Sequence, residues 1–566
     1  MSHSASPEGR TERLGNVPPI PCALPPADDF DTLRSHFRWE VPERFNMAAA
    51  CCDAWAAAAP DRPCLLHCDP QTGRVETLSY GELKRRSEAL AADMLRRGVK
   101  RGDRVALLLP QGFTVAIAHM AIYRIGAIAV PLALLFGLEA LAHRLQVSGA
   151  KAGVTVGDRV AEVRAAAPQL SMIYAAEGAV DGAIDLPSVL SETTHVPAVN
   201  TLADDPALMV FTSGTTGPPK GALHAHRVLL GHVPGVQTHH MPLPVEGDVF
   251  WTPADWAWTG GLLNVLLPGL LMGVPVVSIP PAKFEAEQAF DVMERMRVTR
   301  LFMPPTALRL MRVIERPRER FDLAIRTIGS GGEQLGRPTH DWAKDALGIT
   351  VNEFYGQTEC NLVLSGCAAL DVEDDHAIGR AVPGHEVAVI DEEGRPLPAN
   401  RTGQIAVRKP DPVMFLQYWQ RPEATAAKFV GDWMLTGDQG LADERGYVHF
   451  EGRDDDIITS SGYRIGPGEI EDCLTAHPDV SLAAAVGKPD PLRTEIVKAY
   501  VVVRDGADMN DLTSRLRDHV KKRLSAHEYP REIEFVTELP MTTTGKVIRR
   551  ELRELAKKET GSERLP

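Results

Sequence analysis

The segment 212–221, TSGTTGPPKG, carries the strongest chemical signal in the sequence. Its glycines permit a tight turn in which backbone N–H groups converge on an anion. Hydroxyl side chains and one lysine add further donors, so the segment suits the triphosphate of a nucleotide. The expected phosphate-binding residues are Thr212, Ser213, Gly214, Thr215, Thr216, Gly217 and Lys220. Because Lys220 is followed by Gly221, the spacing is not that of the Walker loop.

The surrounding pattern predicts that this loop belongs to a large α/β domain. Residues 207–211 form a short apolar run of strand type that leads directly into the loop. Upstream, helical patterns at 80–98 and 118–123 alternate with strand patterns at 104–109 and 127–132, as expected for parallel sheets covered on both faces. A surface loop without a ligand is the alternative for 212–221, but such loops rarely combine hydroxyls, glycines and a lysine directly after a strand.

A second, smaller α/β unit is expected after Gly452. A helix begins near Ile470, strands are expected at 496–503 and 532–536, and a final helix at 547–558. Between them, leucines and a valine four residues apart mark an amphipathic helix at 511–524. The predicted organisation is an N-terminal extension (1–44), a large N-terminal domain (45–452), a hinge (453–456) and a C-terminal domain (457–566).

Five further segments follow the phosphate loop: GGEQ at 331–334, YGQTE at 355–359, TGD at 436–438, GRDDDIITSSGYRIGPGEIE at 452–471 and TGK at 544–546. Together and in this order they resemble the motifs of the adenylate-forming superfamily, which contains acyl-CoA synthetases, luciferases and the adenylation domains of peptide synthetases. SSGYRIGPGEIE and GKPDPLRTEIVKAYVVV look most like medium-chain acyl-CoA synthetases. The resemblance implies an α/β fold with a large N-terminal domain of several parts, rich in parallel sheets, and a small mobile C-terminal α/β domain.

The resemblance implies an ATP-dependent acyl-CoA synthetase that makes an acyl-adenylate and then transfers the acyl group to coenzyme A. Lys546, Thr358 and Glu359 would be catalytic, with Glu359 also holding Mg²⁺, a cation that prefers oxygen ligands. Tyr355 would face adenine, and Asp438 would bind the ribose hydroxyls with help from Arg453. The implied nucleotide site also includes Gly332, Glu333, Gln334, Gly356, Gln357 and Arg464.

The second half-reaction implies a different use of the C-terminal domain. Lys546 would crowd the centre at which the CoA thiol must arrive, and the resembled family rotates its small domain about a hinge. Asp455 occupies the matching hinge position, while Gly462 and Tyr463 would line the CoA tunnel. Gly462 has no side chain to obstruct the thiol.

The acyl pocket implied by the resemblance is lined by Trp258, Thr259, Gly260 and Gly331. Acetate-specific relatives place a tryptophan where this sequence has Gly356, so glycine is expected to leave the pocket open to longer chains. Short-to-medium aliphatic acids are the prediction, with acetate or propionate, branched and aromatic acids as alternatives. Two departures from the family pattern are Cys360-Asn361 after YGQTE and the lead MTTTGK before the lysine, and the first leaves the acyl preference open.

Taken singly, several of these residues have simpler interpretations. Asp438 alone would be a turn residue, Lys546 a solvated surface lysine and Tyr355 a core aromatic. The run 454–456 of three aspartates is interpreted as a solvated hinge rather than a metal site, because it lacks spaced ligands. His224 and His226 are interpreted as structural, with a metal or base role as the alternative.

Composition excludes several other classes. The 61 basic and 75 acidic residues give a formal net charge of −14, which disfavours general binding to nucleic acids or anionic membranes. The eight cysteines lack paired CxxC spacing and are expected to be free thiols in the cytoplasm. The most apolar run, 262–281, is broken by glycine and proline, so no membrane span is expected, and the polar first residues lack the apolar centre of a secretory signal.

Rival functions follow from the same motifs. A free-standing adenylation enzyme that loads a carrier protein is the nearest, although no carrier-like segment is expected in this sequence. A luciferase-like oxygenase would share only the first half-reaction. A non-catalytic nucleotide-binding protein would be expected to lose charged groups such as Lys220, Glu359 and Lys546, all of which are present. The expected partners are a small carboxylic acid, ATP and CoA, and homo-oligomerisation is left open.

Overall fold

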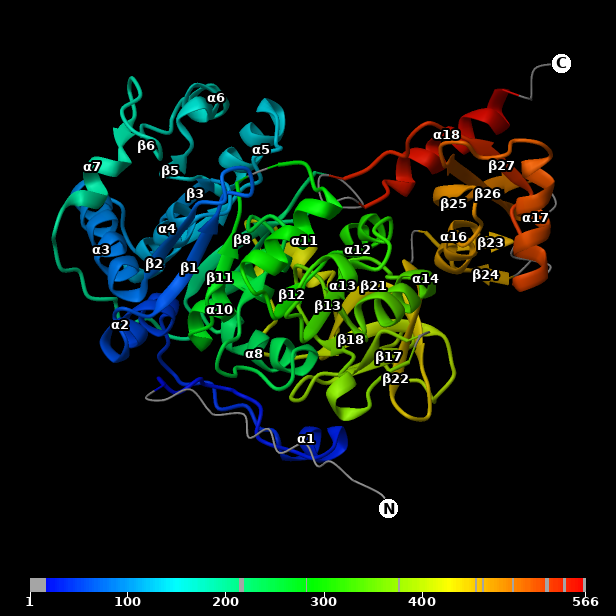
Figure 1. The fold of residues 1–566 in the computed structure, drawn as a ribbon, viewed down its shortest axis with the longest axis horizontal. Coiled ribbons are helices and arrows are strands. Elements are labelled where there is room, and N and C mark those ends of the chain that lie inside the picture. The colour runs from blue at the N-terminus through cyan, green and yellow to red at the C-terminus, as the bar shows by residue number, and fades with distance from the viewer. Residues whose placement is uncertain are drawn as a thin grey trace.

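The computed structural model describes residues 17–212, 218–280, 282–374, 377–453, 456–460, 463–490, 493–524, 529–542 and 546–562. Within these ranges the strands form two sheets in a large N-terminal domain and one in a small C-terminal domain that stands to its side (Figure 1). The predicted α/β fold is therefore confirmed. The mobility of the small domain stays a prediction.

The largest described sheet has 14 strands and combines a parallel centre with antiparallel flanks. Neighbouring strands run parallel from β14 through β13, β12, β10 and β11 to β1, and the remaining pairs are antiparallel. Its members are β1 (Pro63–Cys68), β2 (Val75–Ser79), β10 (Phe250–Trp251), β11 (Val276–Ser278), β12 (Arg300–Phe302), β13 (Thr327–Gly331), β14 (Val351–Tyr355), β15 (Leu364–Ser365), β16 (Gly379–Ala381), β17 (Val387–Ile390), β18 (Gly403–Arg408), β20 (Phe429–Val430), β21 (Trp433–Ala442) and β22 (Tyr447–Arg453).

The second described sheet has eight strands and is parallel except at one edge. There β9 and β19 join antiparallel beside β8, whose end leads into the phosphate-binding segment. Its members are β3 (Arg104–Leu108), β4 (Ile128–Pro131), β5 (Ala152–Thr155), β6 (Met172–Ala175), β7 (Ile184–Asp185), β8 (Pro206–Phe211), β9 (Gly221–Ala225) and β19 (Gln417–Tyr418).

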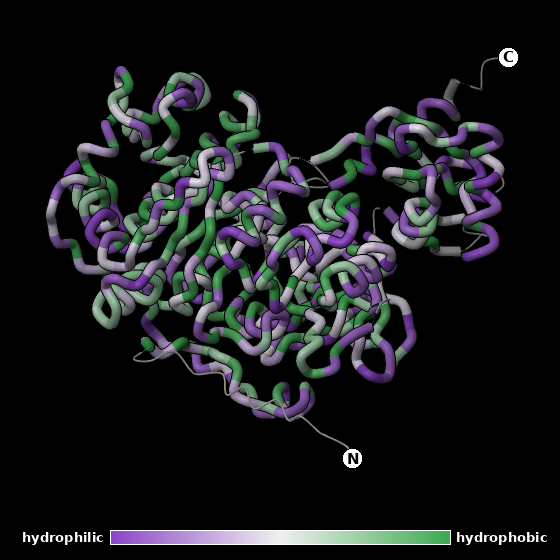
Figure 2. The backbone as a smooth tube through the Cα atoms, viewed as in Figure 1, coloured by the Kyte–Doolittle hydropathy of each residue, from purple (hydrophilic) through white to green (hydrophobic). Residues whose placement is uncertain are grey.

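One continuous apolar core joins the two large sheets. Strands of both contribute to it together with α3 (Tyr80–Arg96), α4 (Phe113–Arg124), α8 (Val228–His239) and α10 (Leu267–Met272). Figure 2 shows hydrophobic segments running through the interior of this domain. The other helices of the large domain are α2 (Ala54–Ala58), α5 (Leu138–Ser148), α6 (Val160–Ala166), α7 (Leu186–Ser191), α9 (Thr259–Gly261), α11 (Ala286–Arg295), α12 (Pro305–Met311), α13 (Pro317–Arg320), α14 (Arg337–Trp342) and α15 (Pro422–Ala426).

The small domain is a sheet with helices on both faces. Its strands are β23 (Ile458–Ser460), β24 (Tyr463–Ile465), β25 (Val480–Asp490), β26 (Thr494–Val503) and β27 (Glu532–Phe535). α16 (Pro467–Thr475) and α17 (Leu512–Arg523) pack on one face, and α18 (Arg549–Ser562) packs on the other. Successive side chains of β25 point to opposite faces of the sheet, and both faces carry apolar residues. Ala483 and Ala485 belong to the core on one face, and Ala484 and Val486 belong to the core on the other.

The predicted elements are present within a few residues of their expected ends. α16 begins three residues before the expected Ile470, because Pro467 is well suited to the first turn of a helix. The apolar run 262–281 is divided as predicted. A π-helix (Leu262–Leu266) and α10 end at Gly273 (φ +71°), and the short β11 follows. In the described parts of the chain, no helix is long and apolar enough to cross a membrane. All eight cysteines are free and buried, which confirms the prediction of free thiols.

The N-terminal extension packs along the lower side of the large domain in Figure 1. α1 (Phe30–His36) buries Phe30 and Leu33 against Tyr447 and its apolar neighbours. The indole of Trp39 donates to the Gly384 carbonyl (2.8 Å). Residues 17–44 are therefore part of the packed structure, whereas residues 1–16 lie outside the described ranges.

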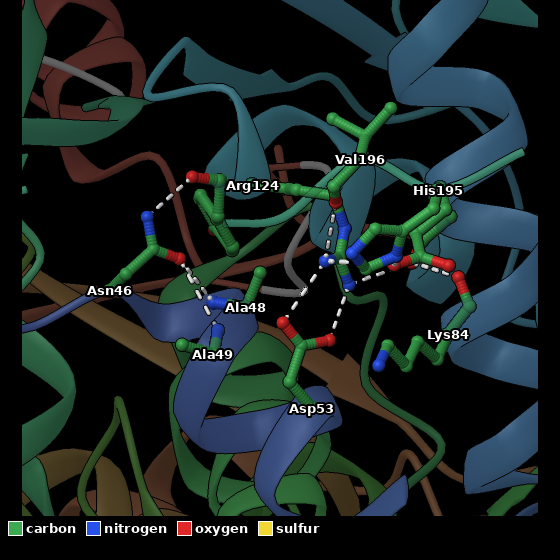
Figure 3. Close-up of polar contacts among 11 residues, drawn as sticks. Asn46, Ala48, Ala49, Asp53, Lys84, Arg124, His195 and Val196 are labelled. Carbon is green, nitrogen blue, oxygen red and sulfur yellow. Dashed lines mark hydrogen bonds and ion pairs between the residues drawn. The ribbon is translucent and has the colours of Figure 1, made fainter. Parts of the chain in front are cut away.

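A buried arginine joins four separate segments of the large domain (Figure 3). Arg124, at the end of α4, is fully buried and donates to both carboxylate oxygens of Asp53 (3.0 and 2.6 Å) and to the Val196 carbonyl (3.0 Å). Glu88 on α3 lies 3.7 Å away, and its carboxylate also pairs with His195 Nδ1 (2.9 Å). Removal of the arginine would leave two carboxylates without their buried counter-charge.

We expect Arg124→Met to lower the free energy of unfolding by about 3–5 kcal/mol, because breaking a buried ion pair leaves an uncompensated charge. The measurement is the urea midpoint followed by tryptophan fluorescence. Arg96→Met is the matched control, since Arg96 also pairs with two carboxylates but is exposed, and it should leave the midpoint nearly unchanged. Equal shifts in the two variants would contradict the interpretation.

Candidate active site

The phosphate-binding segment connects the two strands of a hairpin. β8 and β9 pair antiparallel, and beyond their ends the Thr212 N–H donates to the Lys220 carbonyl (2.9 Å). The hairpin therefore fixes both ends of the loop. Lys220 Nζ lies 5.0 Å from the centre of the Tyr418 ring, a cation–π contact that orients the lysine.

The YGQTE segment forms a tight turn at the carboxyl end of β14. The Gln357 carbonyl accepts hydrogen bonds from the N–H groups of Cys360 (3.2 Å) and Asn361 (2.6 Å). Asn361 has φ +47°, a conformation that glycine favours and asparagine tolerates. The departure from the family pattern at this position is therefore compatible with the turn. Thr358 and Glu359 lie inside it.

Glu359 is nearly buried and is oriented by an aromatic hydroxyl. Tyr418 O–H donates to Glu359 Oε1, and the Phe415 N–H donates to the Glu359 carbonyl (2.8 Å). Tyr418 lies on β19, which pairs with β9, so Glu359 and Lys220 meet at one tyrosine. A carboxylate beside a phosphate-binding loop matches the usual Mg²⁺ environment of one or two carboxylates plus substrate phosphates.

Asp438, on β21, is a buried carboxylate surrounded by donors. Gln357 Nε2 donates to Asp438 Oδ2 (2.6 Å), as does the Tyr355 hydroxyl, and Arg453 Nη1 lies 3.2 Å from Oδ1. Burial raises the pKa of Asp438, while Arg453 and the two hydrogen bonds oppose that change. The same Gln357 amide also donates to the Thr436 carbonyl (2.9 Å). Four predicted nucleotide-site residues are thus in direct contact.

The GGEQ turn at the end of β13 lies where the two domains meet. Arg309 Nη1 donates to Glu333 Oε2 (3.0 Å), and the Thr306 hydroxyl donates to Oε1 (3.3 Å). Gln334 reaches the small domain, since a β-carbon on Gly468 of α16 would lie 2.2 Å from its amide oxygen. Glu333 and Gln334 are therefore positioned by the large domain and face the small one.

Lys546, from the small domain, lies at this same turn. A β-carbon on Gly332 would be 4.0 Å from Lys546 Cε, and Gly332 itself has φ +101°, which only glycine adopts readily. Surrounding protein atoms withhold water and lower the pKa of Lys546, whereas the nearby carboxylates of Glu333 and Asp438 act in the opposite direction. The residue keeps some solvent-accessible surface, so this loss of hydration is partial. The lysine is therefore within electrostatic reach of the Asp438 cluster.

The prediction that Gly356 leaves the acyl pocket open to longer chains stays a prediction, but the space directly beside this glycine is filled. A β-carbon at this position would lie 0.9 Å from the Asn361 carbonyl oxygen and 2.9 Å from the Leu362 nitrogen. The returning backbone of the 357–361 turn fills the space, so Gly356 is required for the turn.

Two phenylalanines lie beside the glycines predicted to line the acyl pocket. A β-carbon on Gly331 would lie 2.6 Å from the Phe354 ring, and one on Gly260 would lie 2.9 Å from the Phe302 ring. The two rings are 5.5 Å apart, and the His239 ring stacks on Phe354 at 4.8 Å. Aromatic side chains therefore cover this face of β13.

The remaining acyl-pocket residues lie at the start of α9. Trp258 precedes this helix, is partly buried and contacts the Phe136 ring edge-on at 5.8 Å. Thr259 and Gly260 form its first turn. Trp256, two residues before Trp258, is 1% exposed and belongs to the main core.

Sequence reasoning missed Tyr418, Phe302, Phe354 and Arg309. Strand alternation was a usable signal for Phe354, because it directly precedes Tyr355 and must face the opposite side of the sheet. Tyr418 gave no such signal, since it lies almost sixty residues from Glu359 and reaches it only through the pairing of β19 with β9.

His224 and His226 are both buried on or beside β9. Burial lowers the pKa of His224 to about 3 and that of His226 to about 4, so both rings are neutral near pH 7. His226 Nδ1 accepts a hydrogen bond from the Met47 N–H (3.2 Å), which supports a structural role. Among the described residues, no group of three or more histidines, cysteines or carboxylates could hold a metal ion.

Several predicted site residues lie outside the described ranges. These are Ser213, Gly214, Thr215, Thr216 and Gly217 of the phosphate loop, Asp455 of the hinge and Gly462 of the CoA site. Tyr463 and Arg464 are described only as backbone, in β24, where they pair with Ser460 and Thr459.

Comparisons with known proteins point to one family. The sequence model of the AMP-binding enzyme family matches residues 52–419, and that of the AMP-binding enzyme C-terminal domain matches residues 469–546. An uncharacterized acyl-CoA ligase of Bacillus subtilis, YtcI, is 33% identical over 88% of this chain and 94% of its own length. The mitochondrial acyl-coenzyme A synthetase ACSM2 of Rattus norvegicus is 34% identical over 92% of this chain and 93% of its own.

Solved structures agree with these sequence comparisons. An acyl-CoA synthetase from Brucella canis has a TM-score of 0.73 at 32% identity and covers 94% of this chain and all of its own. The anthranilate CoA ligase AuaEII, solved with anthranoyl-AMP, has a TM-score of 0.84 at 26% identity, with 92% of this chain and 99% of its own covered.

We expect the pKa of Lys546 to be lower than that of lysines on open surfaces. The crowded boundary between the domains removes water from the ammonium and so disfavours its charged form. Competitive labelling with a limiting amine reagent across a pH series, read by mass spectrometry, measures this. Glu333→Gln is expected to lower the pKa further, because it removes a carboxylate that stabilises the ammonium. A Lys546 that titrates together with the exposed lysines in both proteins would contradict this account.

Proposed function

The chain belongs to the AMP-binding enzyme family and is an AMP-forming acyl-CoA synthetase, and on that premise we propose how its residues divide the reaction. Its substrates are a carboxylic acid, ATP and coenzyme A, and its products are acyl-CoA, AMP and pyrophosphate. The roles of individual residues, the domain limits and the class of acid are our proposals. The observation that carries them is the position of Lys546 beside Gly332, Glu333 and Asp438.

In the first half-reaction, an oxygen of the substrate carboxylate attacks the α-phosphorus of ATP and pyrophosphate leaves. The two anions repel, so the site must supply positive charge where they meet. Lys546 provides it on one side and Lys220 on the other, while the Thr358 hydroxyl donates to the α-phosphate. Bound Mg²⁺, held by Glu359 and the phosphates, would neutralise charge on the leaving pyrophosphate.

The nucleoside is held by the Asp438 cluster. With Gln357, Tyr355 and Arg453 around it, the Asp438 carboxylate is fixed in one orientation before ATP arrives. Its oxygens can then accept from the ribose hydroxyls without reorganisation. The backbone of the turn 332–334 and the ring of Tyr355 complete the adenine side of the site.

In the second half-reaction, the CoA thiol attacks the carbonyl carbon of the acyl-adenylate and AMP leaves. We assign the hinge to 453–456, with Asp455 as the pivot, between a large domain of 45–452 that follows the extension 1–44 and a mobile domain of 457–566. Rotation would withdraw Lys546 and bring Gly462, Tyr463 and Arg464 towards the centre for CoA. The change of sheet between β22, which ends at Arg453, and β23, which begins at Ile458, supports a boundary here.

The acid is proposed to be a short-to-medium aliphatic one. Phe302 and Phe354 cover the face of β13 that carries Gly331, so they limit how far an acyl chain extends. An apolar pocket discriminates by about 1–3 kcal/mol for each methylene, so several related acids should react. A cytoplasmic location is a further proposal, supported by the eight free cysteines.

The function is tested by measuring AMP and pyrophosphate release with ATP, Mg²⁺ and CoA across acids from acetate to dodecanoate, with 2-methylbutyrate and benzoate added. Release of AMP that depends on both acid and CoA is expected. Pyrophosphate release without CoA-dependent turnover would instead favour loading of a carrier protein. Inactivity with every acid would contradict the proposal.

We expect Lys546→Ala to abolish acid-dependent pyrophosphate release but to spare thioester formation from a supplied acyl-adenylate. The lysine stabilises charge only in the first step, and its loss should cost at least about 100-fold in that step. The two half-reactions are measured separately on the same preparation. Equal losses in both would contradict the division of roles.

Phe354→Leu is expected to shift the preference towards longer acids, because the smaller side chain opens space beside Gly331. The value of kcat/KM for the first poorly accepted acid should rise about tenfold or more for each methylene newly accommodated. Phe290→Leu, a matched change in a separate core, should leave the profile of relative rates unchanged. If the two variants had the same profile of relative rates across the acids, Phe354 would not line the acyl pocket.

A further inference from the structure

The position of Lys546 depends on the first turn of α18. The lysine loop is closed by the Thr542 N–H, which donates to the Lys546 carbonyl (2.7 Å), and by the Lys546 N–H, which donates to the Thr542 hydroxyl (3.0 Å). Met541 and Val547 pair as an isolated bridge directly outside it. α18 begins at Arg549, three residues after the lysine. Contacts that hold the start of α18 in place therefore also determine the position of Lys546.

The start of α18 is fixed to the small domain by Arg549. Its Nε donates to Glu471 Oε1 (3.0 Å), and a second bond joins its Nη2 to Oε2, so the pair is bidentate. Glu471 lies on α16 and also accepts from the Ala485 N–H of β25 (2.9 Å). The arginine is therefore anchored to a residue that is itself tied to the sheet.

The first turns of α18 also form ion pairs with Asp456 of the proposed hinge. Arg553 Nη1 forms an ion pair with Asp456 Oδ1, and Arg549 Nη1 lies 3.8 Å from Asp456 Oδ2. Only 11% of the Asp456 side chain and 18% of the Arg553 side chain are exposed. Such shielding from solvent strengthens the attraction relative to an ordinary surface pair.

Asp456 connects in turn to the nucleotide site. Its N–H donates to the Arg453 carbonyl (3.0 Å), which closes a turn at the end of β22. The Arg453 side chain pairs with Asp438 on β21 (3.2 Å). A continuous series of contacts thus runs from the buried carboxylate of the ribose site, through the hinge turn, to the helix that carries the lysine loop.

We propose that Asp456, Arg549 and Arg553 form a clamp that transmits the state of the hinge to Lys546 and thereby positions the lysine for adenylation. They are positioning residues, because none of them reaches the reacting atoms. With the clamp intact, the position of Asp456 and the placement of the lysine are coupled. Without it, the small domain keeps its fold through the packing of Leu552 and Ala556, but the start of α18 is free to shift. This inference rests on the proposed role of Lys546 in the first half-reaction.

The test compares the two half-reactions in Asp456→Asn, which removes the charge while keeping the shape. Pyrophosphate release with ATP, Mg²⁺ and the best acid should fall about 10- to 100-fold, as expected for a misplaced catalytic group. Thioester formation from supplied butyryl-adenylate and CoA should stay within about twofold of the wild type, because that step does not use Lys546. A purely structural role would lower both half-reactions together.

Asp479→Asn is the matched control. It also removes the carboxylate partner of an arginine in the small domain, Arg515 at 2.9 Å, but on α17 and away from the lysine loop. It should leave the ratio of the two half-reactions unchanged. Arg553→Lys, which keeps the charge, should retain much of the adenylation rate, and the exchange of charges in Asp456→Arg with Arg553→Asp should restore part of it.

The outcomes separate the clamp from the proposed function. A wild-type enzyme that releases no pyrophosphate with any acid would overturn the proposed function and the clamp with it. An active wild type whose Asp456→Asn variant matches Asp479→Asn would overturn the clamp alone. Should Asp456→Asn fail to fold, as judged by circular dichroism, Arg553→Lys and Arg553→Gln decide the question by the same ratio of half-reactions.

Discussion

The buried carboxylate of Asp438 must keep its charge in a place that offers it little water. It does so because Arg453, Gln357 and the Tyr355 hydroxyl surround it, and an unpaired charge at such a depth would cost several kcal/mol. The donors come from two distant parts of the chain, the segment 355–357 and Arg453, so the cluster requires β14 with its following turn, β21 and β22 to be in register. The ribose site, the end of the large domain and the beginning of the hinge therefore depend on one set of contacts.

The chain is acidic overall, yet its reaction brings two anions together. A net charge of −14 cannot attract ATP by its long-range field, so binding must rely on donors placed within a few ångströms of the phosphates. We propose that these donors come from both domains, with Lys220 at the base of the β8–β9 hairpin and Lys546 from the small domain. If the small domain rotates as proposed, the charge of Lys546 is supplied for one step and removed for the next.

Two glycines on the predicted acyl side of the site have close neighbours in the fold. From the sequence, Gly356 is expected to leave open space and Gly331 to line the acyl pocket. In the fold, the Asn361 carbonyl occupies the first position and the Phe354 ring lies over the second. Each glycine is required by a close neighbour, and we propose that Phe302 and Phe354 limit the size of the pocket.

The motifs alone determined the family and predicted the domain limits and the nucleotide-site residues, because all of these depend on residue types at short, fixed spacings such as YGQTE and TGD. Periodicity located the strands and helices to within a few residues, since buried faces repeat every two or about 3.6 positions. Only the tertiary structure decided that Tyr418 joins Glu359 to Lys220, that Phe302 and Phe354 cover the acyl face, and that Asp456 is held by α18. These contacts join residues far apart in the chain, and local pattern carries no information about which distant strands and helices will become neighbours.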